Sequence, residues 1–542
     1  MKRWIEFIRA RPRLRLGLEA LGIYLVAFGI FYWRQFLTNH MPGTDGYYHI
    51  KIAWIYLEEG LLRDGFPWAQ YSLWRDSFFD KEFGFHVLLM PFAAGDGSAE
   101  ALMRGAKLAT VTYGALVYPS FYAVLRLSGV KHSWFWTLVF FGSGAYFGWR
   151  INVPRPQIIS MSIALWAAYF VLQRSWKGTL AIAALYALCY TAPLVTVVYA
   201  GVAFVLWGVL EDDWNWRVLA ASVLGVFLGW LFHPHFPNNF RLVWIQLVDV
   251  LGNAWGVAGP NLSLGGEFRP ADTRSFLREH VPVYFVFVMA MLAMTRVKNI
   301  LTPRFLTLFG LANAWFIMTC MTKRFVEYWV PLTVFLSATI FTAFLDEVRK
   351  DPPVIWKKRW IRGVSYAFVI AFMIGIQIYS QVSIAKEFRG PGPGVLDKSA
   401  VALRENSPAN AQVYTCDWDD APELFFHNHH NRYMVFLDPN FMYKWDPSVW
   451  KKWNQVANGK TKQPVDEIVT EFKAYFGVCT NNFSGLRRQL QRDPRAKVTT
   501  YGGGYVFAFD PTARYDTAVA PPRKSAQPSR MSREKAGNEP TP

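Results

Sequence analysis

Long apolar runs alternate with short basic clusters along the first 384 residues of the chain. About eleven runs are long enough to cross, as helices, a hydrocarbon core of roughly 30 Å. They cover approximately residues 17–37, a run that begins near 102, 134–148, 157–173, 178–190, 191–210, 216–233, 281–295, 303–320, 329–345 and 363–381. This pattern predicts an α-helical polytopic membrane protein with about eleven transmembrane helices.

Arginine and lysine residues between the runs predict the orientation. Lys2, Arg3 and four further arginines precede the first run, which lacks a small-residue cleavage site and is therefore expected to be retained. Because cytoplasmic loops collect Lys and Arg, the N-terminus is expected in the cytoplasm. An odd number of spans then places the C-terminal part outside. We expect a protein of the plasma (inner) membrane with an extracytoplasmic, periplasmic C-terminal domain.

The pattern changes after residue 384. A Gly-Pro-Gly-Pro-Gly linker at 390–394 precedes short β-branched and aromatic runs, which predict a small α/β domain over residues 385–511. Residues 512–542 are rich in Pro, Ser, Arg and Lys and are expected to be a disordered tail. Cys416 and Cys479 each end a strand-like run, and the sequence is compatible with a bridge and with two free thiols.

Composition separates a membrane protein from a nucleic-acid-binding one. The chain is 52% hydrophobic and only 18% charged, whereas about a quarter of the residues of soluble domains are charged. Its net charge of +18 comes from 57 basic and 39 acidic residues. The basic residues lie in short clusters between apolar runs and form no single stripe, so we expect no nucleic-acid partner. The sequence has no P-loop or dinucleotide fingerprint.

Two predicted external loops, residues 39–84 and 233–280, are too long for plain connections between spans. Residues 42–49 read Pro-Gly-Thr-Asp-Gly-Tyr-Tyr-His and lead into an amphipathic helix that ends near Glu59. We expect the loop 39–84 to lie on the membrane surface with its aromatic side chains in the interface. Asp45 is either a functional carboxylate or the N-cap of this helix.

The layout resembles a known family. A first span followed by Asp-x-Tyr-Tyr at 45–48, a long first external loop, a many-spanning body and an external C-terminal domain are similar to the GT-C superfamily of polyprenyl-phosphate-dependent glycosyltransferases. The layout is most similar to the catalytic subunit of oligosaccharyltransferases. The resemblance implies a GT-C-like membrane domain over residues 1–384.

Three further segments carry the resemblance. Residues 323–329 resemble the segment whose arginine lies near the lipid-linked donor, which implies that role for Arg324. Residues 265–268 carry Glu267, similar to a glutamate near the acceptor and the metal. Residues 415–420 stand where the family has its acceptor motif, which implies acceptor contacts for Trp418, Asp419 and Asp420.

The sequence departs from the family near residue 150. An acidic pair is expected there, but the chain has Arg150 and Arg155. Since arginine cannot ligate a cation, a requirement for Mg²⁺ or Mn²⁺ stays open; its ligands would be Asp45 and Glu267. The motif at 415–420 lacks a second tryptophan and the following glycine, so transfer to peptide asparagine is not carried over.

Sugar transfer from a polyprenyl phosphate needs a carboxylate that orients or deprotonates the acceptor and cations that stabilise the departing phosphate. Asp45 is predicted as the catalytic carboxylate. Arg324, Arg150 and Arg155 are predicted to bind the donor phosphate through paired hydrogen bonds, with His49 as a further contact. Structural alternatives are snorkelling for Arg150 and Arg155, solvent exposure without function for Glu267, a structural imidazole for His49, and turn capping for Asp419 and Asp420. Arg324 with Glu327 also fits a helical ion pair.

The sequence thus predicts a membrane glycosyltransferase. It would move a sugar or oligosaccharide from a polyprenyl-phosphate-linked donor to an acceptor protein, lipid or glycan, among membrane lipids on the extracytoplasmic face. A transporter or flippase of lipid-linked saccharides and an assembly scaffold are the alternatives. The first of these is less favoured because the sequence shows no inverted repeats.

Overall fold

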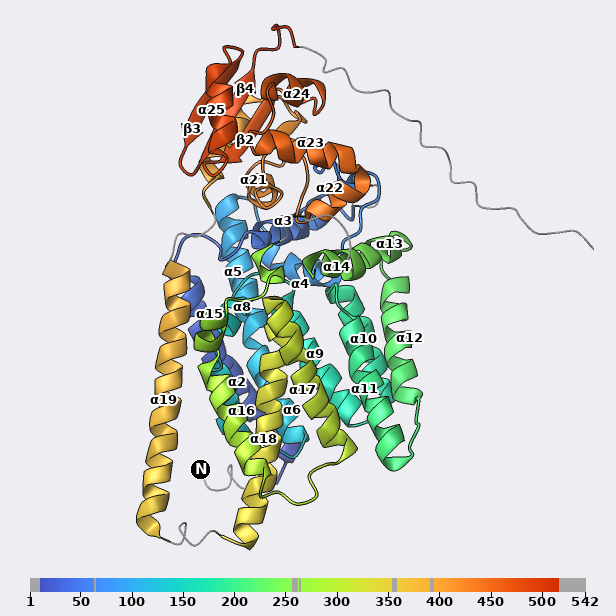
Figure 1. Cartoon of the computed structure of the whole chain (residues 1–542), viewed down its shortest axis with the longest axis vertical. Helices are drawn as coiled ribbons and strands as arrows, with labels where there is room; N and C mark the ends of the chain where they lie inside the picture. Colours follow the sequence, from blue (N-terminus) through green and yellow to red (C-terminus); the bar gives the residue numbers. More distant parts are fainter. Residues whose placement is uncertain are drawn as a thin grey trace, which may run out of the picture.

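A computed structural model describes residues 10–62, 65–255, 262, 265–352, 358–389 and 394–515. Most of the predicted linker, residues 390–393, and most of the predicted tail, residues 516–542, lie outside the described residues. Figure 1 shows a bundle of helices with the C-terminal domain stacked on one of its ends.

The helical part and the C-terminal part have the following elements. The helical part contains α2 (Pro12–Gln35), α3 (Asp45–Glu58), η1 (Leu73–Arg75), α4 (Phe83–Ala93), α5 (Ala99–Ala115), α6 (Val117–Leu127), α7 (Ser133–Phe141), α8 (Ala145–Arg150), α9 (Gln157–Leu172), α10 (Trp176–Cys189), α11 (Leu194–Glu211), α12 (Arg217–Leu231), α13 (Asn238–Trp244), η2 (Ile245–Asp249), α14 (Val250–Ala254), η3 (Gly266–Phe268), α15 (Thr273–Glu279), α16 (Val281–Met294), α17 (Pro303–Met321), η4 (Lys323–Phe325), α18 (Val326–Lys350) and α19 (Arg359–Arg389). The C-terminal part contains α20 (Asp397–Asn406), β1 (Val413–Thr415), α21 (Ala421–His427), α22 (Pro439–Trp445), α23 (Pro447–Ala457), α24 (Pro464–Thr470), β2 (Phe476–Thr480), α25 (Ser484–Arg492), β3 (Ala496–Tyr501) and β4 (Gly504–Phe509).

Six helical segments of the described chain are long and apolar enough to cross a membrane, which makes the chain an integral membrane protein. They are Pro12–Gln35, Ala99–Leu127, Leu194–Glu211, Pro303–Met321, Lys323–Lys350 and Arg359–Arg389. The pair α15 and α16, bent by 73°, adds up to one more. The apolar helices α4, α9, α10 and α12 are shorter. The count of eleven spans therefore stays a prediction.

The exposed apolar face of helix α19 indicates that lipid surrounds the bundle. The helix runs along the edge of the bundle beside α2, α7 and α8 (Figure 1). Its outer face leaves Val364, Phe368, Ile370, Ile374 and Ile378 exposed, each by more than half. A contiguous apolar surface of this kind is unfavourable in water and is typical of contact with lipid.

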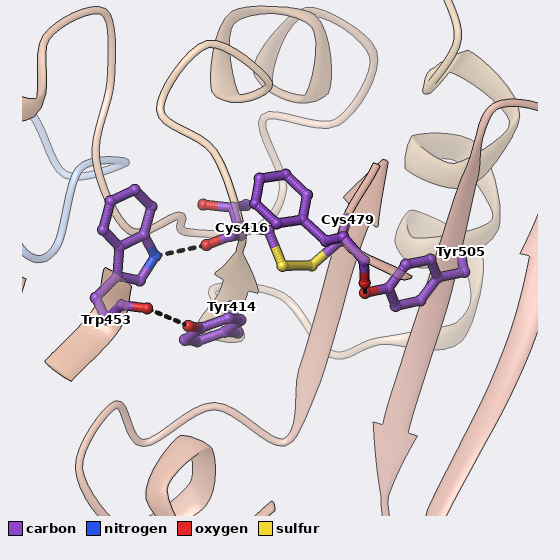
Figure 2. The surroundings of a disulfide bond; sticks show 7 residues. Tyr414, Cys416, Trp453, Cys479 and Tyr505 are labelled. Carbon is purple, nitrogen blue, oxygen red and sulfur yellow. Dashed lines mark hydrogen bonds between the residues drawn. A yellow bond between two sulfur atoms is a disulfide. The ribbon is translucent and has the colours of Figure 1, made fainter. Parts of the chain in front are cut away.

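The C-terminal part contains a mixed sheet with the strand order β1-β2-β4-β3. Strands β1 and β2 are parallel, and their register pairs Thr415 with Val478. The next residue on each strand is a cysteine, so the pairing brings Cys416 and Cys479 side by side. They form a disulfide with Cα atoms 5.2 Å apart (Figure 2). The bridge that the sequence left open is therefore formed.

Helix α3 lies between the bundle and the C-terminal part (Figure 1). Ten of its 14 residues are buried, because the first loop and the C-terminal part share one hydrophobic core. Phe66 of the loop packs against Phe425 and Phe436, with ring centroids 5.6 and 5.1 Å apart. The backbone of Tyr433 donates to the Trp68 carbonyl at 2.7 Å. The expectation that the aromatic residues of this loop lie in the membrane interface is wrong for Tyr47, Tyr48 and Tyr56 of α3, since they are buried inside the protein.

The disulfide predicts the number of reactive thiols. Of the four cysteines, Cys189 and Cys320 are free. Denatured protein purified from membranes should bind two molecules of polyethylene-glycol maleimide without reductant and four after reduction, counted by gel shift. A Cys416→Ser, Cys479→Ser double variant should bind two under both conditions. Four labelled thiols in unreduced wild-type protein would contradict the pairing.

Candidate active site

A cavity of about 420 Å³ opens where the first loop, the bundle and the C-terminal part meet. Its size is that of a small-molecule site. Eight of the nine predicted site residues line it: Asp45, His49, Arg150, Arg155, Glu267, Arg324, Trp418 and Asp419. Asp420 does not line it, and within the described chain its side chain makes no capping hydrogen bond to α21.

These residues come from segments that are far apart in the sequence. Asp45 is the first residue of α3, and Arg150 is the last residue of α8. Glu267 lies in the short helix η3, and Arg324 lies in η4, just before α18. Asp419 follows β1 and reaches the cavity from the C-terminal part. Short elements and helix ends thus bring the polar groups together at one end of the bundle.

The carboxylate of Glu267 holds three arginines together. Its Oε2 lies 3.0 Å from Arg155 Nη1, and its Oε1 lies 3.1 Å from Arg324 Nη1. Arg150 also donates to Oε2. Burial alone would raise the pKa of Glu267, but Arg150, Arg324 and Arg155 together lower this pKa below its ordinary value. Glu267 is therefore an ionised anchor for the arginine side chains.

Arg150 lies at the base of this network. Only 1% of its side chain is exposed, and its Nε donates to Glu327 Oε1 at 2.8 Å. The snorkelling alternative does not apply, because the guanidinium is enclosed between Glu327 and Glu267. A buried arginine with two glutamate partners satisfies its charge internally.

Arg324 faces the cavity in a different way. Its Nη2 donates to the hydroxyl of Tyr190 at 2.8 Å, and its guanidinium lies 5.3 Å from the ring of Phe268. A quarter of its side chain, 25%, is exposed. The i,i+3 ion pair of Arg324 with Glu327 is not formed among the described residues, because Glu327 binds Arg150 instead. Arg324 therefore keeps donor capacity for a ligand.

Asp45 is held by Arg155 and does not act as the N-cap of α3. Its Oδ1 lies 3.1 Å from Arg155 Nη2. Helix α3 begins at Asp45, and the N-cap residue Thr44 makes no capping hydrogen bond within the described chain. Thr44 instead donates to Asp419 Oδ1 at 2.8 Å. Asp45 and Asp419 therefore face the same part of the cavity.

Asp419 is harder to ionise than an ordinary aspartate. Burial raises the pKa of its carboxyl to about 6, and the negative charge of Asp45 contributes to the rise. The hydrogen bond from Thr44 and the charge of Arg155 oppose this shift. The charge at this end of the cavity consequently changes between pH 5 and pH 7.

The donor set does not fit a divalent cation. The described residues contain no group of three or more His, Cys, Asp or Glu side chains that could hold a metal ion. Asp45 and Glu267, the two predicted ligands, are each paired with arginine. Mg²⁺ and Mn²⁺ prefer several oxygen ligands. We therefore derive no chemical step through a metal.

Several contacts at the site could not be predicted from the sequence. Lys323 lines the cavity beside Arg324. Tyr190, which lies in an apolar run, accepts a hydrogen bond from Arg324, and the partner of Glu327 is Arg150 and not the nearby Arg324. His49 is bonded to a second imidazole, His86, at 2.8 Å. No local spacing signals these pairs, because the partners come from different helices.

No protein-family profile and no curated protein sequence matches this chain. Several solved structures match this chain in three dimensions. The oligosaccharyltransferase of Archaeoglobus fulgidus has a TM-score of 0.62 at 12% identity, over 87% of this chain and 71% of that protein. ArnT from Cupriavidus metallidurans, bound to undecaprenyl phosphate, has a TM-score of 0.54 at 14% identity, over 92% of this chain and 98% of that protein. Arabinofuranosyltransferase AftD from Mycobacteria has a TM-score of 0.54 at 13% identity, over 92% of this chain and 40% of that protein.

The chain therefore shares the fold of these three proteins, and the resemblance drawn from the sequence is confirmed at the level of the fold. Among the three, ArnT is the one whose length this chain covers almost completely.

The arginine network predicts an unequal cost for two glutamate substitutions in α18. Glu327→Gln leaves the buried Arg150 short of a charge partner and should cost about 3 kcal/mol of the free energy of unfolding. Glu347→Gln removes an exposed pair with Lys350 and should cost less than about 0.5 kcal/mol. Unfolding by SDS in detergent micelles measures both. Equal stabilities of the two variants would contradict the structural role of the Arg150–Glu327 pair.

Proposed function

We propose that this protein is a membrane glycosyltransferase that moves a sugar or oligosaccharide from a polyprenyl-phosphate-linked donor to an acceptor. The observation that carries the proposal is the cavity in which Asp45, Arg155, Glu267 and Arg324 meet at one end of the bundle. A GT-C fold and neighbours bound to undecaprenyl phosphate and dolichol-phosphate support it.

Four of the cations that line the cavity divide into two groups in this proposal. Arg150 and Arg155 hold Glu267 and Asp45 in place. Arg324, a quarter exposed, and its neighbour Lys323 are the cations that contact the donor phosphate. The planar guanidinium offers a phosphate two parallel hydrogen bonds, and the ammonium adds a point charge.

Transfer proceeds by a single displacement with inversion. A heteroatom of the acceptor attacks the anomeric carbon while the bond from that carbon to the phosphate oxygen breaks. The electron pair leaves with the phosphate oxygen, where Arg324 and Lys323 stabilise the growing charge. Asp45 contacts the acceptor and orients its heteroatom toward the anomeric carbon. The acceptor gives up one proton during the step.

The C-terminal part supplies the acceptor side of the site. Trp418 and Asp419 line the cavity opposite the bundle, and a tryptophan face suits both a sugar ring and an apolar group. The acceptor is a protein, a lipid or a glycan. In this proposal residues 1–384 form the membrane domain and residues 385–511 form the acceptor platform.

The proposal places the reaction on the extracytoplasmic face of the plasma (inner) membrane. The disulfide Cys416–Cys479 supports this side, since disulfides persist in oxidising compartments. The basic N-terminal segment supports a cytoplasmic N-terminus.

Asp45→Asn should abolish transfer and leave donor binding intact. In cells that lack the protein, mass spectrometry should show the lipid-linked donor accumulating with Asp45→Asn at matched membrane levels. Product formation should fall about 100-fold, because the acceptor is no longer oriented by a charged group. Asp76→Asn, an exposed carboxylate of the same loop paired with Arg75, is the matched control and should restore product. Full restoration by Asp45→Asn would favour a transporter or scaffold.

A further inference from the structure

A buried chain of three side chains ends at the cavity. The carboxylate of Asp80 lies 2.7 Å from His86 Nδ1, and His86 Nε2 lies 2.8 Å from His49 Nδ1. Asp80 and His86 are fully buried, and His49 is 3% exposed, where it lines the cavity. The chain therefore connects a carboxylate in the interior with an imidazole at the cavity wall.

The carboxylate of Asp80 is held in its ionised form. Tyr56 donates its hydroxyl to Oδ2 at 2.7 Å, and the backbone of Glu82 donates to Oδ1 at 3.1 Å. Burial tends to raise the pKa of Asp80, but His86 and the hydroxyl of Tyr56 lower it to about 2. An ionised carboxylate only accepts hydrogen bonds, so the Nδ1 atom of His86 carries the proton.

The direction of the hydrogen bond from His86 to Asp80 bears on the direction of the next one, between His86 and His49. In the arrangement that we infer, His86 carries this single proton and accepts at Nε2, and His49 donates from Nδ1. A neutral His49 with its proton on Nδ1 then has an electron pair on Nε2. Within the described part of the chain, no partner is recorded for His49 Nε2. The tautomer is therefore set from the interior outward.

His49 and Asp45 are one helical turn apart on α3, and both line the cavity. Residues at i and i+4 share one face of a helix, so the two side chains meet the same ligand. A free electron pair on an imidazole repels a phosphate oxygen, and the predicted phosphate contact of His49 does not fit this tautomer. The same electron pair suits a donor hydroxyl or amide of the acceptor.

We propose that His49 Nε2 is the base that accepts the acceptor's proton, with His86 and Asp80 as positioning residues. The inference rests on the proposed glycosyl transfer and adds the destination of the proton. As the acceptor heteroatom bonds to the anomeric carbon, its proton moves to Nε2. The phosphate oxygen keeps the electron pair of the broken bond. The imidazolium of His49 is stabilised through His86 by the charge of Asp80.

The surroundings keep His49 neutral before the reaction. Burial lowers the pKa of His49 well below its ordinary value, and the positive charges of Lys81 and Arg155 lower it further. The titratable groups around the chain are Tyr48, Tyr56, Lys81, Glu82, Arg155 and His233. The base is therefore unprotonated at neutral pH, when an acceptor enters.

Nitrogen NMR shows which nitrogen of His49 carries the proton, and it needs no substrate. In full-length protein labelled with ¹⁵N-histidine and reconstituted in lipid, the His49 signals are assigned by their loss in His49→Gln. At pH 7.5 we expect a protonated Nδ1 and an unprotonated Nε2. A protonated Nε2 would overturn the proposal, because the base would then have no electron pair for the acceptor.

Activity in cells tests the role. His49→Gln should lower product formation about 100-fold, and His132→Gln, an exposed histidine that does not line the cavity, should leave it unchanged. His86→Gln and Asp80→Asn should each lower it about tenfold. The residual rate of His49→Gln should rise about tenfold per pH unit, because hydroxide replaces the base.

The outcomes separate this inference from the proposed function. If His49→Gln keeps its rate and pH profile while Asp45→Asn is inactive, the base assignment is wrong and glycosyl transfer stands. If wild-type protein changes neither lipid-linked saccharides nor glycosylated products, the proposed function fails. The NMR result then still shows whether the hydrogen bonds from His49 through His86 to Asp80 run in the proposed direction.

Discussion

The structure depends on the pairing of buried charges around Arg150. This guanidinium is enclosed by Glu327 of α18 and Glu267 of η3, and an unpaired charge at this depth would cost several kcal/mol. The pairing therefore requires α8, η3 and α18 to meet at one end of the bundle. Once they meet, Glu267 also gathers Arg155 and Arg324, and Arg155 positions Asp45. The site is a consequence of satisfying one buried cation.

The C-terminal part completes this arrangement. It shares a hydrophobic core with the first loop, covers α3, and brings Asp419 to the cavity through a hydrogen bond with Thr44. Its disulfide joins the two neighbouring strands β1 and β2 just behind the loop that carries Trp418 and Asp419. This cover leaves His49 buried and Asp45 only partly exposed, so the charges around them interact more strongly than they would on an open surface.

Sequence patterns predicted the parts of the site that follow from position along the chain. Asp45, Arg150, Arg155 and Arg324 stand near the ends of apolar runs, and Glu267 stands in a predicted external loop. Span ends and loops on one side of a membrane lie near one another. Their partners were not predictable. The sequence suggested an ion pair between Arg324 and the nearby Glu327, but Glu327 pairs with Arg150, 177 residues away. His86 and Asp80 look like ordinary loop and helix residues until the fold brings them to His49. The burial of α3 depends on a core shared with residues more than 300 positions away, which no local periodicity records.

Donor recognition by the arginine network is the central claim of this account, and the affinity for undecaprenyl phosphate tests it most directly. Purified protein in nanodiscs is titrated with this lipid and compared with Arg324→Gln and with Arg269→Gln, an exposed arginine next to the η3 helix. The account predicts that wild type and Arg269→Gln bind alike, and that Arg324→Gln binds at least about tenfold more weakly, the loss of one charge-assisted hydrogen bond. Equal binding by all three proteins would contradict it.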